Sequence, residues 1–276
     1  MNTSVSAPAL ARQRVDFQAK SAARLSAFAI YGLGAVLFGA TAFVWRDFNT
    51  WQPADGLNSP ILRAVLLYAT AVAQIIGGIA IQRRETLRFG SAALLCVAVI
   101  YAIFRLPHVV ATPLVYAPWG GLSENLSIVA GAMILFGLSS RDGRQGRTLV
   151  QAGRVLFTVC VASFMLYQAF YIPDTASLVP KWIPPSQVFW AIATTIAFGL
   201  AALALALRRA DVLATRLLTA MLLIFQVTIW IPMLVASPHS HMLWAANAQN
   251  FSIAGAAWIV SWLVSSAFSD KGLEET

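Results

Sequence analysis

The sequence predicts an all-α membrane protein with eight transmembrane helices arranged as two parallel-repeat four-helix bundles. Three observations lead to this fold class. Hydrophobic residues make up 59% of the 276 residues and charged residues only 11%, which is far from the balance of soluble globular proteins. The apolar residues gather in runs long enough to cross a bilayer, and the second half of the chain repeats features of the first. A water-soluble fold is therefore not expected.

Each apolar run is predicted to be a helix, because unpaired backbone groups cannot face lipid. The first run, Leu25–Trp45, contains 21 uncharged residues. At 1.5 Å per residue it spans about 31 Å, enough to cross a bilayer core. No small-residue cleavage signature follows it, so we expect a retained helix rather than a removed signal peptide. The other predicted spans are Ile61–Ile81, Ser91–Val110, Leu122–Leu138, Val155–Ile172, Val188–Leu207, Leu217–Ala236 and Phe251–Phe268.

The connections between these runs alternate in charge. Of the 19 Lys and Arg residues, 15 lie in every second connection or in the terminal segments. The positive-inside rule then places both termini in the cytoplasm. The net charge of +8 is explained by this topology, so the predicted partner is the lipid bilayer and no nucleic acid is expected.

An internal repeat with a register of 125 residues relates the two halves. Nine of the 26 positions from 107 to 132 are identical to the positions 125 residues later, among them Pro, Trp and Asn, which membrane composition seldom matches by chance. Because each unit has an even number of helices, the repeats are predicted to be parallel. The predicted organisation is a cytoplasmic basic N-terminal segment 1–24, a first four-helix unit 25–138, a basic cytoplasmic linker 139–154, a second four-helix unit 155–268 and a cytoplasmic tail 269–276.

Arg105 and Glu124 are the charged residues predicted to lie well inside helices. Both are about 21 Å from the cytoplasmic ends of adjacent antiparallel helices, so an ion pair is expected between them. The corresponding residues of the second unit are Trp230 and Gln249. Three roles stay open for the pair: a structural clamp, a polar group that binds a ligand, and a carboxylate that handles protons.

The other candidate binding residues lie near the outer ends of the predicted helices. An aromatic belt at the membrane interface accounts for some tryptophans, but less readily for those in loops. Asn125 and Asn250 are expected either to cap helices or to hydrogen-bond across them. The remaining candidates are Trp51, Trp119, Trp182, Trp244, His108, His239 and His241.

The histidines do not form a convincing metal or haem site. His239 and His241 alternate rather than sharing one helical face, and no carboxylate motif lies near them, so no metal is assigned. The two cysteines, Cys96 and Cys160, are far apart in sequence. No phosphate-binding loop, zinc-protease motif or serine-hydrolase motif is present. Catalytic residues are therefore unknown, and an enzymatic role would be associated with an oxidoreductase.

The sequence resembles the DoxX-like family of four-helix membrane proteins, present here twice. The resemblance covers roughly residues 25–138 and 155–268. It is carried by the segment 179–185 (VPKWIPP), the basic pairs Arg83-Arg84 and Arg208-Arg209, and helix ends that include Pro107 and Pro232. The resemblance implies a multi-pass protein of the bacterial inner (plasma) membrane. It also implies, loosely, an association with quinone-linked sulfur oxidation or with membrane-associated oxidoreductases.

Three functions are compatible with these features. The first is a membrane subunit of a redox assembly, in which a quinone or small substrate binds at the outer end. Its first-unit pocket would contain Trp51, Trp119, Arg105 and Glu124, and its second-unit pocket Trp182, Trp244 and Asn250. The alternatives are a noncatalytic membrane scaffold or assembly factor, and a small-molecule carrier. Midspan polar residues are sparse, which ranks the carrier third.

Overall fold

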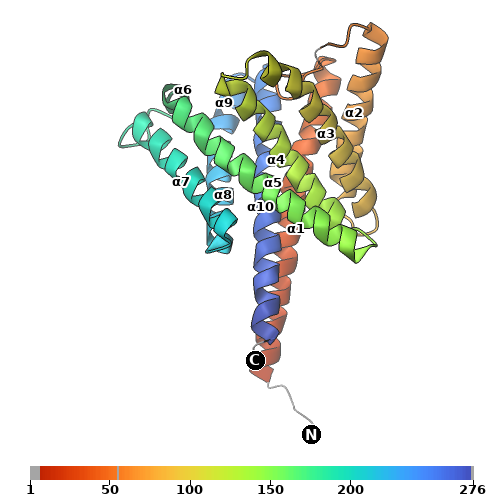
Figure 1. The fold of residues 1–276 in the computed structure, drawn as a ribbon, viewed down its shortest axis with the longest axis vertical. Helices are drawn as coiled ribbons and strands as arrows, with labels where there is room; N and C mark the ends of the chain where they lie inside the picture. Colours follow the sequence, from red (N-terminus) through yellow and green to blue (C-terminus); the bar gives the residue numbers. More distant parts are fainter. Residues whose placement is uncertain (1–6, 55, 275–276) are drawn as a thin grey trace.

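The computed structural model describes residues 7–54 and 56–274, with side chains described for 22–54 and 56–266. Its regular elements in these ranges are helical, and Figure 1 shows their arrangement. They are α1 (Ala7–Trp45), α2 (Pro60–Ala80), α3 (Leu87–Ala111), α4 (Tyr116–Leu138), α5 (Gly143–Phe170), α6 (Ile172–Leu178), α7 (Gln187–Leu207), α8 (Asp211–Phe225), the π-helical segment η1 (Gln226–Trp230), α9 (Ile231–Ala236) and α10 (His241–Glu274).

Seven helices of the described residues are long and apolar enough to cross a membrane. They are Ala22–Trp45 within α1, the helices α2, α3, α4, α5 and α7, and the continuous segment Asp211–Ala236. The prediction of a multi-pass helical membrane protein is confirmed at this level. The eighth predicted span, Phe251–Phe268, lies within α10, where its last two side chains fall outside the described part of the chain.

Several helices begin earlier than the hydropathy pattern predicts. Helix α5 starts at Gly143 rather than Val155, because the Asp142 carboxylate accepts hydrogen bonds from the backbone N–H groups of Arg144 and Gln145 and so caps the helix. Most of the predicted linker 139–154 is therefore helical. Helix α1 likewise begins at Ala7 and α10 at His241. Hydropathy marks where a helix becomes apolar, whereas Ala, Arg and Gln continue it into the polar region.

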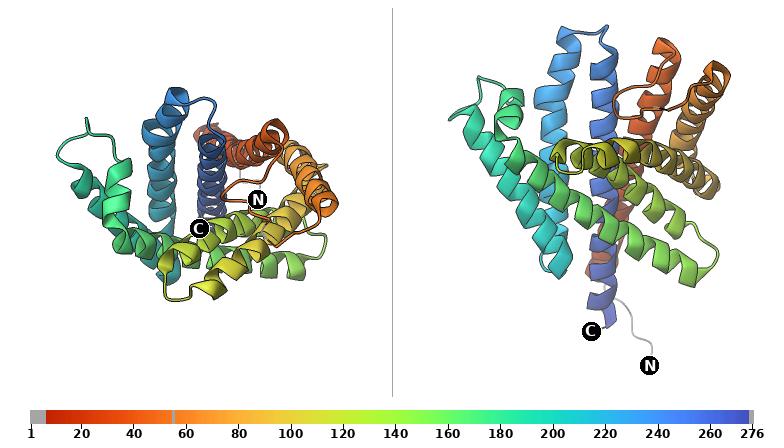
Figure 2. Two further views of the ribbon diagram at one scale, coloured as in Figure 1. Left: turned by 90° about the horizontal axis from the view of Figure 1, so that it is seen from above. Right: turned by 45° about the horizontal axis from the view of Figure 1, so that its top comes forward.

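The helices of the two predicted four-helix units make extensive contacts with one another. The most extensive contacts join α1 to α10 and α4 to α5, so the first helix of each predicted unit lies along the fourth helix of the other. Figure 2 shows α1 and α10 side by side. Each unit alone is open between its first and fourth helices, and a helix of the other unit covers that opening.

Small residues allow these close contacts. A Cβ atom on Gly255 of α10 would lie 2.4 Å from Cα of Tyr31 in α1, and one on Gly153 of α5 would lie 2.9 Å from the carbonyl oxygen of Ala130 in α4. Glycine lets backbones approach at such crossings, where van der Waals packing drives association in lipid. The hydroxyl of Tyr31 also donates a 2.6 Å hydrogen bond to the carbonyl of Ile128, which links α1 to α4.

The connections sort to the two ends of the molecule. The α2–α3, α4–α5 and α7–α8 connections lie towards the end at which the described chain starts and finishes (Figure 1). The longer α1–α2 connection, α6 and the α3–α4 connection lie at the opposite end. The former end is called the basic end below, because its connections and the helix ends that adjoin them carry most of the arginines. The latter is called the loop end.

Candidate functional site

A cavity of about 380 Å³ lies among α4, α5, α6, α7, α8, η1 and α10. We call it the central cavity. Most of its wall is apolar, and a few polar side chains reach it from α4, α5, α7 and α10. This combination is typical of sites that bind small hydrophobic ligands. The lining includes Glu124, Phe164, Tyr167, Gln168, Trp190, Thr194, Phe198, Leu222, Thr228, Ile229, Trp230, Asn250 and Ile253.

The π-helical segment η1 forms one wall of this cavity. Pro232 follows it and has no backbone N–H, so the normal hydrogen bond to the carbonyl of Thr228 cannot form. The helix widens into η1 at this point, whereas α3 stays α-helical through the corresponding Pro107 as far as Ala111. Single π-helical turns are frequent at functional sites. The widened turn contributes Thr228, Ile229 and Trp230 to the cavity.

A buried cluster of three side-chain amides, Gln226, Asn247 and Asn250, links η1 to α10. The Nε2 atom of Gln226 donates to Oδ1 of Asn247 at 2.5 Å, and Nδ2 of Asn250 donates to Oε1 of Gln226 at 2.6 Å. Nδ2 of Asn247 also donates to the carbonyl of Trp230 at 3.0 Å. The three side chains therefore satisfy one another and hold the widened turn against α10. The alternative prediction for Asn250, a hydrogen bond across helices, is the one found.

Replacing Gln226 with leucine is expected to lower the free energy of unfolding by about 1–3 kcal/mol, because Asn247 and Asn250 would each lose a partner in a buried site. Thermal unfolding of the detergent-purified protein measures this. Gln168→Leu is the matched control, because Gln168 is only half-buried. Its Oε1 atom accepts hydrogen bonds from the hydroxyls of Thr194 and Thr195, and both hydroxyls have backbone carbonyls as alternative acceptors, so neither loses every partner. An equal loss in both variants would contradict the buried-cluster explanation.

Glu124 of α4 forms the charged edge of the central cavity and is partly accessible from it. Its Oε2 atom accepts a 2.8 Å hydrogen bond from Nε1 of Trp51, which the α1–α2 connection carries across to α4. The Arg105 guanidinium interacts electrostatically with the same carboxylate. Gly121 makes room for it, since a Cβ there would lie 2.9 Å from Nη1 of Arg105. The structure thus brings three predicted site residues together.

Gln249, which corresponds to Glu124 in the 125-residue register, lies beside this carboxylate. Its side chain is 3% exposed, and neither its amide nitrogen nor its oxygen makes a hydrogen bond of regular geometry. Buried amides without such a bond are uncommon. The central crossing of α4 and α10 therefore carries a polar pair in which one member is charged and the other is neutral.

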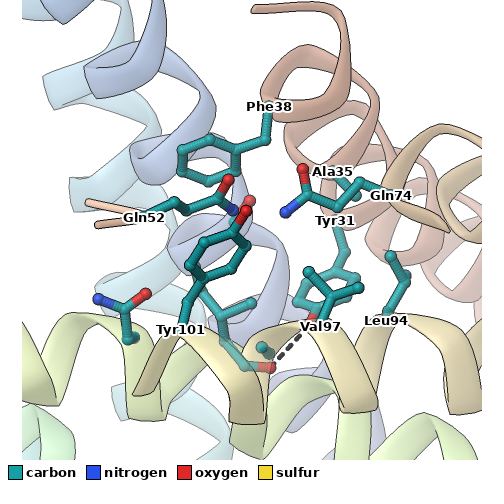
Figure 3. Close-up of a pocket in the computed structure, with 12 residues that line it drawn as sticks. Tyr31, Ala35, Phe38, Gln52, Gln74, Leu94, Val97 and Tyr101 are labelled. Carbon is teal, nitrogen blue, oxygen red and sulfur yellow. Dashed lines mark hydrogen bonds between the residues drawn. The ribbon is translucent and has the colours of Figure 1, made fainter. Parts of the chain in front are cut away.

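A second cavity, of about 30 Å³, lies among α1, α2, α3, α4 and α10. Figure 3 shows Gln52, Gln74 and Tyr101 directed towards its centre, with Tyr31 below them. Asn125 also lines it. Asn125 donates to the carbonyl of Gly121 from the middle of α4, so the predicted helix cap at this position is wrong. The volume suits a single water molecule and excludes an organic ligand.

A shallow pocket at the loop end contains Arg105 and His108 together with Arg63. Arg63 forms a 2.7 Å ion pair with Asp47, and the two side chains are 40% and 58% exposed. Burial acts to raise the pKa of Asp47, but the Arg63 hydrogen bond and nearby positive charge outweigh it and hold the pKa below its usual value. The neighbouring Asp47 carboxylate therefore partly neutralises the positive charge of this pocket.

The remaining predicted site residues lie away from the central cavity. Trp119 and Trp244 donate through Nε1 to the carbonyls of Pro113 and Pro238, and Trp182 is 74% exposed. His239 is exposed. His241 stacks on Trp45 at 5.1 Å, and burial lowers its pKa. In the described residues no three His, Cys, Asp or Glu side chains gather as metal ligands would.

Sequence reasoning missed most of the cavity wall. Tyr167 and Thr194 were not singled out, because isolated polar residues in a span give no pattern that distinguishes a ligand site from helix packing. The available signals were Pro232 and the midspan glutamine Gln168. Of the predicted site residues, Glu124 and Asn250 line the central cavity.

Comparison with known proteins finds no match for this chain among protein-family models, curated proteins or solved structures. The class of protein is therefore defined by the fold and the cavity: a multi-pass helical membrane protein with a largely apolar, partly open cavity.

Proposed function

We propose that the central cavity binds a lipid-soluble molecule of the quinone class and that the protein is a membrane subunit of a redox assembly. The observation that carries the proposal is the composition of the cavity wall, which is mostly apolar and aromatic with a few separated polar groups. Sites for hydrophobic cofactors combine these two features. No catalytic residue is assigned, so the electron-transfer partner would be a membrane-associated oxidoreductase.

The wall offers contacts that suit a quinone ring. Trp190 and Trp230 present aromatic surface, against which a flat ring stacks favourably. Quinone carbonyls need hydrogen-bond donors, and the Gln168 amide supplies one because its oxygen already accepts two threonine hydroxyls. The Glu124 carboxylate at the cavity edge is an acceptor for the hydroxyl of a reduced quinol. These contacts favour a ring with polar groups over a saturated hydrocarbon.

The architecture we propose is a tandem duplication with eight spans, both termini in the cytoplasm of the inner membrane, and a DoxX-like unit in each half. Matching hydrogen bonds support the duplication. Trp119 donates to Pro113, and Trp244 donates to Pro238, at positions 125 residues apart. The reciprocal packing of α1 on α10 and of α5 on α4 also supports a two-fold relation. The basic connections gathered at one end support the orientation (Figure 1).

We place the quinone site in the second half of the chain because the two halves differ around the central cavity. In the 125-residue register Arg105 corresponds to Trp230, and Tyr101 corresponds to Gln226. Where the first half has a cavity for one water, the second half has the widened η1 turn and about 380 Å³. Specialisation of one repeat is the arrangement that this difference supports.

Replacing Ile229 with tryptophan is expected to weaken quinone binding about tenfold or more, because the larger side chain occupies the cavity. Binding of a short-chain ubiquinone analogue to the purified protein, measured by titration calorimetry, tests this. Val227→Trp is the matched control, since Val227 lies in the same η1 turn but is 64% exposed and does not line the cavity. No binding by the unmodified protein, or equal binding by both variants, would contradict the proposal.

A mild-detergent pull-down tests the assembly separately. Stoichiometric capture of an oxidoreductase is expected. Capture of partners without quinone binding would favour the noncatalytic scaffold, and substrate-dependent flux in proteoliposomes would favour the carrier.

A further inference from the structure

A groove runs along the exposed face of α5 at the basic end of the molecule. It is shallow and open rather than enclosed. Arg147 and Gln151 lie at one part of it, and Val155 and Val159 continue it along the helix towards the middle of the span. Arg208 closes it from the α7–α8 connection. The groove is therefore charged at one end and apolar at the other.

Two arginines from different elements meet at the charged end. Arg208 is the C-terminal cap of α7, and its φ of 52° turns the chain there. Its Nη2 atom donates to Oε1 of Gln151 at 3.3 Å, which holds the guanidinium over α5. Arg147 lies one helical turn before Gln151 on the same helix, so both guanidinium groups border the same groove.

Asp211, which begins α8 after the α7–α8 turn, does not neutralise them. Asp211 forms a 2.7 Å ion pair with Arg154, and both side chains are only 13% exposed. Within the described residues neither Arg147 nor Arg208 has an ion pair with a carboxylate. The groove therefore presents two positive charges near the start of the apolar span Gly143–Phe170.

The apolar end has the geometry of a lipid-facing surface. Val155 and Val159 are 57% and 60% exposed and four residues apart, so they share one face of α5. In a membrane this face is covered by acyl chains. The molecule that matches both ends has one or two acyl chains and a negatively charged phosphate headgroup.

We propose that this groove is a binding site for an anionic phospholipid. Arginine binds phosphate oxygens through paired N–H groups. Basic sites at helix ends select anionic headgroups over zwitterionic ones, in which a choline cancels the phosphate charge. The site lies on α5 and the α7–α8 turn, and the proposal does not depend on the proposed quinone function.

Native mass spectrometry of the detergent-purified protein with equal amounts of phosphatidylglycerol and phosphatidylcholine tests the proposal. We expect retained lipid to be mostly phosphatidylglycerol. The double variant Arg147→Gln/Arg208→Gln is expected to lose roughly tenfold or more of the affinity for phosphatidylglycerol and to keep its affinity for phosphatidylcholine.

The matched control is Arg141→Gln/Arg209→Gln, which removes the same charge from two exposed arginines of the neighbouring connections that do not line the groove. It is expected to keep the lipid preference. Equal losses in both double variants would show diffuse surface charge and overturn the site, as would the absence of any preference in the unmodified protein. If the α7–α8 turn does not tolerate Arg208→Gln, Arg147→Glu alone gives the same test, and unchanged quinone binding separates it from the central cavity.

Discussion

Replacing Gly255 with leucine is expected to destabilise the folded protein by about 3 kcal/mol or more, near or above the upper range for overpacked sites. A Cβ at position 255 would lie 2.4 Å from Cα and 2.5 Å from the backbone nitrogen of Tyr31. No rotation of a side chain relieves a contact with backbone, so α1 and α10 would have to separate. This crossing belongs to the most extensive helix contacts of the molecule, and Tyr31 also ties α1 to α4 through its hydroxyl.

Thermal unfolding in a fixed detergent measures the effect of the change at Gly255, with Gly255→Ala as a smaller step in the same direction. Gly199→Ala is the control, because the nearest atom to its added Cβ is Cγ of Met165 at 3.3 Å, which belongs to a flexible side chain. That variant is expected to be neutral or slightly stabilised, since alanine favours a helix over glycine. Similar melting temperatures for all three variants would mean that the two long helices do not pack as described.

Much of the helical architecture was predictable from the sequence, because an apolar run long enough to cross a bilayer predicts a helix without any knowledge of tertiary contacts. The ends of the predicted spans at Trp45, Leu138 and Leu207 coincide with the ends of α1, α4 and α7. The starts were less accurate, since caps such as Asp142 extend helices beyond the apolar run. Reciprocal packing of the first helix of one half on the fourth helix of the other could not be predicted, because it depends on contacts distant in sequence.

The site was predictable only at residues whose burial in a membrane has a high free-energy cost. Glu124 and Arg105 were found because burying either charge has a clear cost, and the structure brings them together. Trp51 was a candidate as a loop tryptophan, but its bond to Glu124 depends on the path of the α1–α2 connection. The cavity wall at Ile229 or Phe198 is apolar and carries no sequence signal that separates it from ordinary core.

Arg105 and Glu124 give a prediction that separates a structural clamp from a ligand site. Glu124→Gln and Arg105→Gln are each expected to lower stability, and the double variant is expected to recover part of the loss, because one unbalanced charge costs more than none. Fully buried pairs lose 3–5 kcal/mol in such tests; since Glu124 borders a cavity and Arg105 is partly exposed, we expect about 2 kcal/mol. Arg105→Gln should lower stability more than Glu124→Gln, because it leaves the Glu124 carboxylate with the Nε1–H of Trp51 as a hydrogen-bond donor but without the positive charge of Arg105.

The exposed pair Arg63 and Asp47 serves as the control for this cycle. Its two side chains are 40% and 58% exposed, so Arg63→Gln is expected to change stability by less than about 1 kcal/mol. Melting temperatures of all variants are compared with their affinity for the quinone analogue. Loss of stability with partial recovery in the double variant assigns the Arg105 and Glu124 charges to a clamp. Normal stability with weakened binding would instead favour Glu124 as a ligand contact, because the loss of affinity would then not come from a loss of the fold.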